Sequence, residues 1–182
     1  SNDGESLYFV GYGTFLVCVD AMQGTLAWIS AQHGYTLGST HASPLYNVGQ
    51  TGGWLFLGTT EGFAAYDAVD GTRVWHDSLR SPRNFHGYDL TTAVGVGAGD
   101  DAVILVGSED QFVYAFSGSG ARIGRIETDA GIKAPPVLHP TQSIVYIAGE
   151  DWQMRALQFD ALTRNDTLDC YYVAATGKEC DT

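Results

Sequence analysis

The stretch WLFLGTTEGFAAYDAVDGTRVW, from Trp54 to Trp75, decides the fold of this 182-residue chain because related stretches recur along it. The other copies cover residues 7–28, 103–124 and 145–166. One glycine holds the same place in each copy, so that successive copies are offset by 47, 49 and 42 residues; these glycines are Gly11, Gly58, Gly107 and Gly149. A repeat of this length indicates a fold built from similar units placed side by side.

Each copy has the composition of short strands joined by tight turns. In the copy quoted above, the apolar runs 54–57 and 63–66 are separated by Gly- and Thr-rich residues, and a third run begins after an Asp-Gly turn. This alternation predicts β-hairpins. A further extended segment lies upstream of three of the copies, at 42–46, 92–94 and 134–137. Each complete unit is therefore predicted to contain four short antiparallel strands.

The repeat predicts an all-β fold, a single β-propeller region over residues 1–182 with about four blades of four antiparallel strands. The blade repeats are expected at about residues 7–30, 41–79, 91–128 and 134–174. A β-sandwich is the alternative architecture, but a sandwich would not need this repetition.

About four blades make only part of a closed ring. The first copy has no upstream strand, and an open arc leaves apolar sheet faces uncovered at about 25 cal/mol per Å². Three explanations stay open: a piece of a longer chain, two copies that form an eight-bladed ring, and an arc completed by a partner. The segment Leu168–Ala174 is expected either to supply a strand to another blade or to complete its own.

A second pattern lies in the latter half of two copies, where Asp, Gly and Trp are spaced four residues apart. Its residues are Asp20, Gly24 and Trp28 in one copy, and Ala65, Asp67, Gly71 and Trp75 in the other. The pattern resembles the tryptophan-docking repeat of the PQQ-like, or quinoprotein-type, β-propeller family. That family includes the propeller lipoprotein of the outer-membrane β-barrel assembly machine.

The resemblance implies a structural role for these residues. The Trp is expected to pack between adjacent blades, the Gly to permit its close approach, and the Asp to accept backbone N–H groups of the turn. The third copy has Phe116 and Gly124 in place of the Asp and Trp, and the fourth copy has Gln158 and Asp166. Docking in those copies is therefore expected to be weaker or different.

The same family contains alcohol dehydrogenases that bind pyrroloquinoline quinone, and these need a full ring, a Ca²⁺ site and adjacent cysteines. This sequence has no adjacent cysteines. No metal-binding spacing links its histidines (His33, His41, His76, His86 and His139), and no G-x-S-x-G motif occurs. We therefore expect no cofactor, no metal, no catalytic residues and no enzymatic activity.

Two groups of residues are candidates for an interaction surface. Turns that follow the repeated glycines carry carboxylates, which are expected to gather on one face as an acidic arc beside Trp152; these are Glu61, Glu109, Asp110, Glu150 and Asp151. Such an arc would suit a basic partner, or a hard cation bound through oxygen ligands. The longest irregular connection, residues 81–89, supplies the second group: Arg83, Phe85, His86 and Tyr88.

Charge and cysteine usage bear on partners and compartment. Nine basic residues against 21 acidic ones give a net charge of -12, which argues against nucleic acid and anionic membranes as partners. Cys170 and Cys180 are candidates for a disulfide, and Asn165 begins a glycosylation sequon. Both features favour a secreted, periplasmic or lumenal location over the cytoplasm.

These observations favour a non-catalytic propeller scaffold that binds another protein, or a second copy, within a larger propeller or assembly. One alternative is a carbohydrate- or ligand-binding module that uses Tyr35, Tyr88 and Trp152. The other is a non-catalytic fragment of a quinoprotein-like dehydrogenase.

Overall fold

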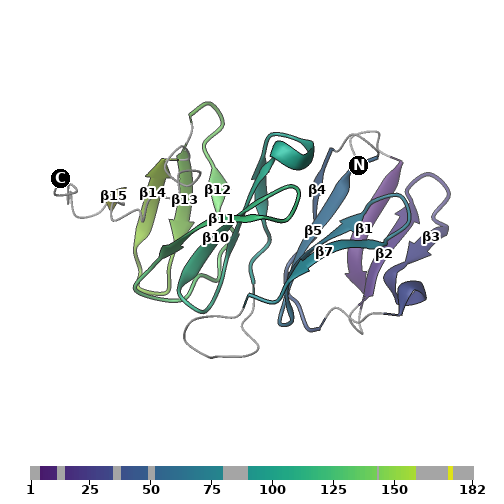
Figure 1. Cartoon of the computed structure of the whole chain (residues 1–182), viewed down its shortest axis with the longest axis horizontal. Helices are drawn as coiled ribbons and strands as arrows, with labels where there is room; N and C mark the ends of the chain where they lie inside the picture. Colours follow the sequence, from purple (N-terminus) through teal and green to yellow (C-terminus); the bar gives the residue numbers. More distant parts are fainter. Residues whose placement is uncertain are drawn as a thin grey trace.

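Four antiparallel β-sheets follow one another along the chain in the computed structural model (Figure 1). The structure describes residues 5–11, 15–34, 38–48, 52–79, 90–142, 144–158 and 172–173. Within these residues the only helices are two short 3-10 turns, η1 (Ser30–His33) and η2 (Gly99–Asp101). No helix in the described part of the chain is long and apolar enough to cross a membrane.

We call the four sheets blades 1 to 4, in chain order. Blade 1 has three strands, namely β1 (Ser6–Gly11), β2 (Phe15–Asp20) and β3 (Leu26–Ile29). Blade 2 consists of β4 (Leu45–Asn47), β5 (Trp54–Thr59), β6 (Gly62–Asp67) and β7 (Arg73–Asp77). Blade 3 consists of β8 (Val94–Val96), β9 (Val103–Gly107), β10 (Phe112–Ser117) and β11 (Arg122–Glu127). Blade 4 consists of β12 (Val137–Leu138), β13 (Ile144–Ala148), β14 (Met154–Gln158) and β15 (Tyr172–Val173).

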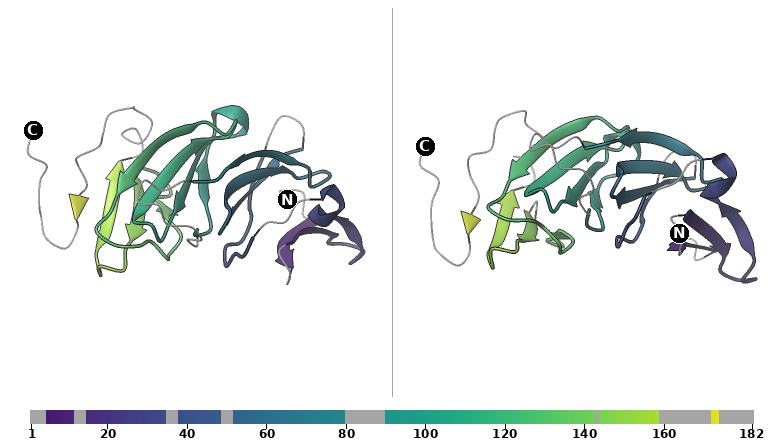
Figure 2. Two further views of the ribbon diagram at one scale, coloured as in Figure 1. Left: turned by 60° about the horizontal axis from the view of Figure 1, so that its bottom comes forward. Right: turned by 90° about the horizontal axis from the view of Figure 1, so that it is seen from below.

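The blades stand side by side in a curved arc (Figure 2). The predicted all-β propeller of four-stranded antiparallel blades is thereby confirmed, with one blade short of its innermost strand among the described residues. Strand β15 pairs with β14 through Arg155–Val173 and Ala156–Tyr172. Residues 172–173 of the segment 168–174 thus form a strand in their own blade, which is one of the two roles expected for the segment.

The core of the molecule lies between the blades, because each sheet packs its faces against the blades that flank it. Blades 2 and 3 meet through an aromatic cluster in which Phe116 lies 5.1 Å from Phe63 and 5.7 Å from Trp75, measured between ring centroids. Blades 3 and 4 meet through an aliphatic cluster that includes Leu105 and Ile147. Burial of these side chains stabilises the arc by about 1.5–3 kcal/mol each.

Tryptophans of the outermost strands join blade 1 to blade 2 and blade 2 to blade 3. The Trp28 indole Nε1 donates to the Ala68 carbonyl at 3.2 Å, and its ring lies against Gly71. In the next pair of blades, Trp75 Nε1 donates to the Gly118 carbonyl at 3.0 Å, and its ring lies against Gly120.

The turn glycines are required at both contacts. Gly71 and Gly120 have φ of 77° and 95°, and a Cβ on either would come within 2.5 Å and 2.7 Å of the indole. The acidic residues fix the same turns: Asp20 Oδ1 accepts from the backbone N–H groups of Met22 and Gln23, and Asp67 Oδ1 accepts from Val69.

The third copy aligns differently from the ungapped sequence comparison. Ser117, rather than Phe116, ends strand β10 at the place of Asp67, and its Oγ accepts from Ala121 N–H at 3.0 Å. Phe116 is fully buried against Trp75. The reason is turn length: Gly58 pairs with Phe63, whereas Gly107 pairs with Val113, so the turn between β9 and β10 has one extra residue.

The docking position of a blade is the residue of its outermost strand that pairs with the residue two places before the end of the preceding strand. Trp75 pairs with Ala65, and Gly124 pairs with Ala115, so Gly124 holds this position in blade 3. In blade 4 the position belongs to Tyr172, which pairs with Ala156, and not to Asp166, which lies outside the described residues. Gln158 does hold the place of the acidic residue, since it pairs with Ile144 as Asp67 pairs with Trp54.

The repeated glycines are also only partly in structural register. A Cβ on Gly58 would come within 2.4 Å of Leu90 Cβ, and one on Gly107 within 2.4 Å of Ile132 Cγ2, so both admit a side chain of the next blade. Strand pairing gives the same position to Val10 in blade 1 and Ala148 in blade 4, one residue before Gly11 and Gly149. A one-residue difference in the hairpins hides this shift from an ungapped comparison.

We predict that Gly71→Ala destabilises the protein more than Gly34→Ala, a matched control. Both positions have nearly equal φ, 77° and 76°, and therefore share a strain of about 1 kcal/mol. Only Gly71 also places its new Cβ against the indole of Trp28, which adds about 2 kcal/mol. Urea unfolding of the two variants measures the difference, and equal losses would contradict a blade-docking role for Gly71.

Candidate functional site

The turn between β13 and β14 displays an aromatic side chain to solvent. Trp152 is 98% exposed and adopts a left-handed φ of 61°. Its backbone N–H donates to the Gly149 carbonyl at 3.2 Å, and Asp151 Oδ1 accepts from Gln153 N–H at 3.1 Å. The backbone is thus fixed by hydrogen bonds while the indole projects away from the blade.

A buried arginine supports this turn from below. Arg155 has no exposed side-chain surface, and it forms an ion pair with Asp151, a second with Asp129 at 3.0 Å, and a 3.3 Å hydrogen bond to Gln153. Burial alone would lower the pKa of Arg155, but the hydrogen bond and charge of Asp151 raise it. Hydrogen bonding from Arg155 in turn lowers the pKa of Asp151. Both groups are therefore held in their charged forms.

Sequence reasoning missed Arg155, although a signal was present. Strand β14 alternates, and Leu157, two residues along, points into the aliphatic core between blades 3 and 4. Arg155 thus occupies an inward position with a carboxylate four residues before it. A charge in the apolar half of an alternating strand marks a buried ion pair.

A lysine connects the turns of blades 3 and 4. Lys133 Nζ lies 3.4 Å from Glu109 and 2.8 Å from Glu150. Its pKa is raised, first by the hydrogen bond and charge of Glu150 and then by those of Glu109. Two residues of the predicted acidic arc are thus brought together by a cation of the same chain.

Asp110 does not face solvent as the predicted arc requires. It is 4% exposed, it accepts a 2.6 Å hydrogen bond from Tyr114 Oη, and it accepts another from Phe112 N–H. Burial, followed by the contact with Asp110, raises the pKa of the Tyr114 hydroxyl. Asp110 is a structural residue of blade 3, because its carboxylate accepts hydrogen bonds from its own hairpin.

The remaining carboxylate of the arc, Glu61, is exposed on the turn of blade 2. Its backbone carbonyl lies 3.0 Å from His76 Nε2. Of the five predicted carboxylates, Glu61 and Glu150 are exposed, Glu109 and Asp151 are partly buried, and Asp110 alone is buried. Three of them have a cationic partner in the same chain, since Glu109 and Glu150 share Lys133 and Asp151 pairs with Arg155.

A cavity of about 260 Å³ lies beside Lys133. Segments that precede the inner strands of blades 2, 3 and 4, together with Glu109 of the turn between β9 and β10, line this cavity; the lining residues are His41, Ala42, Leu90, Thr91, Thr92, Glu109, Ile132, Lys133 and Pro135. The upstream segments were predicted as strands, and the cavity beside them was not predicted. Their signal was the recurrence itself, since segments at the same place in successive blades meet on one side of the arc.

Several predicted site residues lie outside the described residues: Arg83, Phe85, His86, Tyr88, Tyr35, Cys170, Cys180 and Asn165. Cys18, which is described, is a free and buried thiol whose pKa is raised by burial. In the part of the chain that the structure describes, no group of three or more His, Cys, Asp or Glu residues could hold a metal ion.

Comparisons with known proteins agree with this architecture. A family model described as outer membrane protein assembly factor BamB matches residues 1–127. Among solved structures, BamB from Moraxella catarrhalis is 18% identical, with a TM-score of 0.65 over 89% of this chain and 49% of that chain. The computationally designed Ika8 protein is 13% identical, with a TM-score of 0.59 over 92% of this chain and 46% of that chain.

A third similar structure is Sqt1 from Saccharomyces cerevisiae, 12% identical, with a TM-score of 0.70 over 97% of this chain and 57% of that chain. No curated protein matches the sequence. The chain spans about half the length of the solved structures it resembles, and at these identities they show its fold.

We predict that Asp151→Asn lowers the free energy of unfolding by about 3 kcal/mol at neutral pH, because it leaves the buried Arg155 short of a carboxylate. Asp129→Asn is the matched control; this carboxylate is 68% exposed, and its loss should cost less than about 1 kcal/mol. Urea unfolding of both variants measures the two losses.

The pH dependence of the Asp151 variant follows from the lowered pKa of the carboxyl. A depressed folded-state pKa contributes stability that is present above the unfolded value, about 3.9, and is lost as pH falls through the folded pKa. The gap between Asp151→Asn and the unsubstituted protein should therefore narrow below about pH 4. A gap that stays constant to pH 2 would contradict the ion pair.

Proposed function

Since the chain belongs to the BamB family of outer membrane protein assembly factors, we propose that it is a non-catalytic propeller scaffold that binds another protein. The contact surface in this proposal consists of Trp152 and the Lys133 cluster, which we define as Lys133, Glu109 and Glu150. It is formed by the turns of blades 3 and 4.

The exposed indole of Trp152 carries this proposal. A tryptophan left almost entirely in water sacrifices the free energy of burying its ring, and a left-handed backbone at a bulky residue adds strain. The hydrogen-bonded turn above the buried Arg155 keeps the ring in that position. Rigid aromatic side chains of this kind are the usual anchors of protein–protein interfaces.

The surroundings of Trp152 supply the polar rim that such an anchor needs. Glu150 precedes it in the same turn and is tied to Lys133, which also lines the 260 Å³ cavity. The polar side chains of Thr91, Thr92 and His41 also line the cavity. An aromatic anchor with polar groups around it is the composition of a specific interface.

The electrostatics of the turns support a binding role rather than catalysis. A carboxyl group that acts as a general acid has its pKa raised toward neutrality, and a nucleophilic lysine has its pKa lowered toward neutrality. Here the pKa of Asp151 is lowered and that of Lys133 is raised, so both shifts run the other way. These groups are suited to holding turns in place.

One observation favours a second candidate, a carbohydrate-binding module. An exposed, rigidly held indole can stack on the apolar face of a sugar ring as well as on a protein surface. The two candidates share Trp152 and differ in the partner, so a binding assay with each class separates them.

An exported location and an assembled state complete the proposal. The family description concerns outer membrane assembly, and we infer that this chain also works outside the cytoplasm, as part of a larger propeller or assembly. Peptide mapping under non-reducing conditions tests the location: a linked peptide containing Cys170 and Cys180, separated by reduction, is expected for protein taken from its source. Two free thiols would argue for a reducing compartment.

We predict that Trp152→Ala weakens partner binding without changing stability. A photo-crosslinking amino acid at position 152 should link one main protein in the source cells, and outer membrane assembly proteins are the first candidates to check. With that protein purified, calorimetry should show a Kd at least about 30-fold higher for Trp152→Ala, as expected for an interface anchor.

Val69→Ala is the matched control, because Val69 is an exposed apolar residue, at 65%, on a turn of blade 2. It should leave both Kd and the unfolding midpoint unchanged. A glycan array forms the other arm of the experiment: sugar binding that Trp152→Ala removes, with no crosslinked protein, would replace the scaffold proposal by the carbohydrate one.

A further inference from the structure

We propose that the cavity of about 260 Å³ beside Lys133 is a pocket for one arginine side chain of a protein partner. The proposal rests on the binding role proposed above for the turns of blades 3 and 4, and it adds the chemistry of the residue that the partner presents. Its basis is the shape of the cavity and the charges at its rim, and neither of these depends on Trp152.

The volume of the cavity suits a single side chain. A cavity of about 150 Å³ accepts a molecule of the size of benzene, whereas pockets for drug-sized ligands begin at about 300 Å³. At about 260 Å³ this cavity lies between the two sizes. It therefore has room for one long side chain and too little room for a larger ligand.

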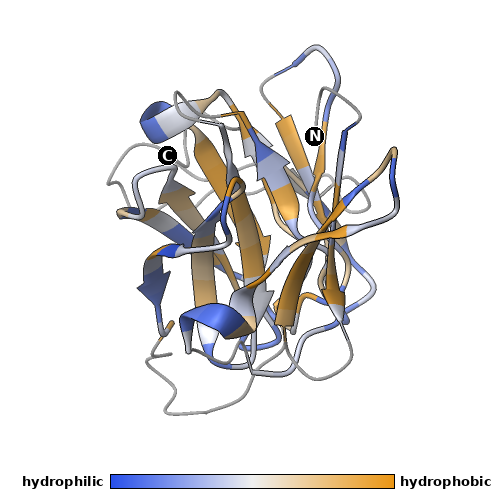
Figure 3. Cartoon of the chain, turned by 90° about the vertical axis from the view of Figure 1, so that its right-hand side faces the viewer, coloured by the Kyte–Doolittle hydropathy of each residue, from blue (hydrophilic) through white to orange (hydrophobic). Residues whose placement is uncertain are grey.

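The floor of the cavity is apolar and comes from three different contacts between blades. Ala42 belongs to the core between blades 1 and 2, Leu90 to the core between blades 2 and 3, and Ile132 to the core between blades 3 and 4. All three are buried. Figure 3 shows the same division in the molecule as a whole, since most strands are hydrophobic and many connecting turns are hydrophilic. The methylene groups of a long side chain can therefore pack on this floor while its polar end stays at the rim.

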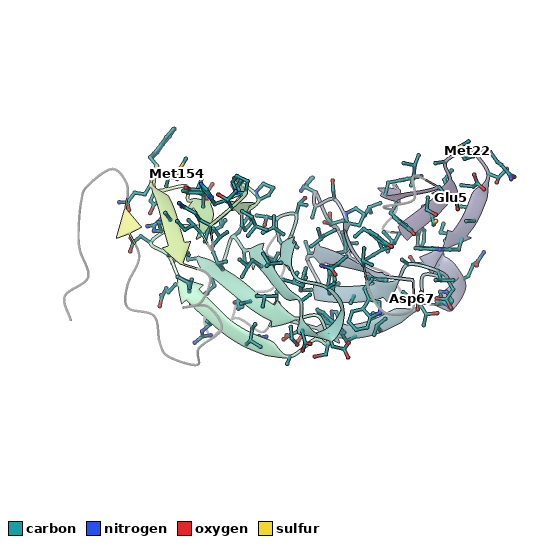
Figure 4. The ribbon with its side chains drawn as sticks, turned by 90° about the horizontal axis from the view of Figure 1, so that it is seen from above. Glu5, Met22, Asp67 and Met154 are labelled. Carbon is teal, nitrogen blue, oxygen red and sulfur yellow. The ribbon has the colours of Figure 1, made fainter. Side chains whose placement is uncertain are left out.

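Hydrogen bonds between neighbouring segments hold the walls of the cavity in place. Thr91 Oγ1 accepts from Gly107 N–H at 3.0 Å. Thr92 Oγ1 accepts from Ser43 N–H at 2.8 Å, which ties the segment before blade 3 to the segment before blade 2. Figure 4 shows side chains between successive blades along the arc, so the segments that carry the walls rest on a packed interior. A pocket that is already formed loses little conformational entropy when it binds.

The rim of the cavity carries a carboxylate with a distant counter-ion. Lys133 Nζ lies 2.8 Å from Glu150 and 3.4 Å from Glu109, so the lysine is closer to the carboxylate outside the cavity than to the one that lines it. The Glu109 side chain is also less exposed than that of Glu150, 30% against 49%. Two carboxylates around one ammonium leave a net negative charge, and a partly buried carboxylate gains from a closer cation. Glu109 is therefore the group that a cationic side chain would meet.

Arginine matches this combination of an apolar floor and an acidic rim better than lysine does. Its guanidinium is a planar fork that pairs with a carboxylate through two hydrogen bonds, and it is less strongly hydrated than an ammonium, so it loses less on entering a pocket. Arginine is also enriched among the anchor residues of protein interfaces. The net charge of -12 on this chain attracts a partner that presents basic residues.

Titration of the 182-residue chain with N-acetylargininamide tests the pocket, with the amide NMR signals of Thr92, Ile132 and Lys133 as the readout. We expect saturable shifts of these signals with a Kd on the order of 1 mM, the affinity of a single side chain. N-acetylcitrullinamide has nearly the same shape without the charge, and it should bind at least about 10-fold more weakly. N-acetyllysinamide should also bind more weakly than the arginine compound.

Variants at the rim test the sign of the charge. Glu109→Gln should raise the Kd of N-acetylargininamide about 10-fold. Glu61→Gln is the matched control, because Glu61 is exposed on the corresponding turn of blade 2 and does not line the cavity; it should leave the Kd unchanged. Lys133→Met keeps a side chain of similar length and removes the competing cation, so it should lower the Kd several-fold. Urea unfolding checks that all three variants are folded.

Three outcomes would overturn the arginine pocket: no saturable shifts at about 10-fold above the expected Kd, tighter binding of the lysine compound, or loss of affinity in Lys133→Met with preferential binding of N-acetylglutamic acid amide, which would indicate an anionic occupant. Trp152→Ala separates this proposal from the scaffold proposal, since Trp152 is not among the lining residues and its loss should leave the Kd of the probe unchanged. If a partner binds through Trp152 and the probe does not bind, only the pocket is wrong. If the probe binds and Trp152→Ala does not weaken partner binding, only the anchor role of Trp152 is wrong.

Discussion

The structure depends on the contact between an outer-strand tryptophan and a turn glycine of the next blade. A blade is a thin sheet with two apolar faces, so it is stable only when neighbours cover both. The indole of Trp28 or Trp75 fixes how close the next sheet comes, since its ring rests on a glycine without a Cβ and its N–H donates to one defined carbonyl. Blades 3 and 4 lack this contact, because Gly124 holds the docking position, and the aliphatic cluster and the ion pairs of Arg155 and Lys133 take its place. The candidate interaction surface therefore lies where ion pairs, rather than a docked tryptophan, join two blades.

Because the blades are fixed relative to one another, turns that lie far apart in the sequence form one surface. Turns at the same place in successive blades meet on one side of the arc, which brings Glu109 of one hairpin and Glu150 of the next to the same lysine. Arg155 and Asp151 hold the last of these turns from within, and Trp152 is exposed as a consequence of that geometry. Rigidity matters for recognition because an anchor that is already ordered loses little conformational entropy when it binds.

The repeat made the fold predictable, since its period, its Gly- and Asp-rich turns and its alternating strands all indicate the same four-stranded unit. The docking residues of blades 1 and 2 were equally readable from spacing. An ungapped comparison could not show two changes of length. One extra residue in the turn between β9 and β10 moved the acidic place of blade 3 from Phe116 to Ser117, and a longer connection after β14 moved the docking place of blade 4 from Asp166 to Tyr172. The acidic arc was misjudged for a different reason, because the sequence shows the carboxylates but not which partners they bond. Asp110 and Asp151 bond to Tyr114 and Arg155 of their own hairpins, whereas Lys133 reaches Glu109 and Glu150 through the tertiary fold.

In a repeat protein, the contacts between inner blades show what kind of surface packs against each end blade. The faces buried between blades 1 and 2 or between 2 and 3 show what belongs against Leu7 at one end and Met154 at the other. The inner contacts therefore define the apolar neighbour that each end face accepts. The net charge of -12 opposes any association that does not bury enough apolar surface to overcome it.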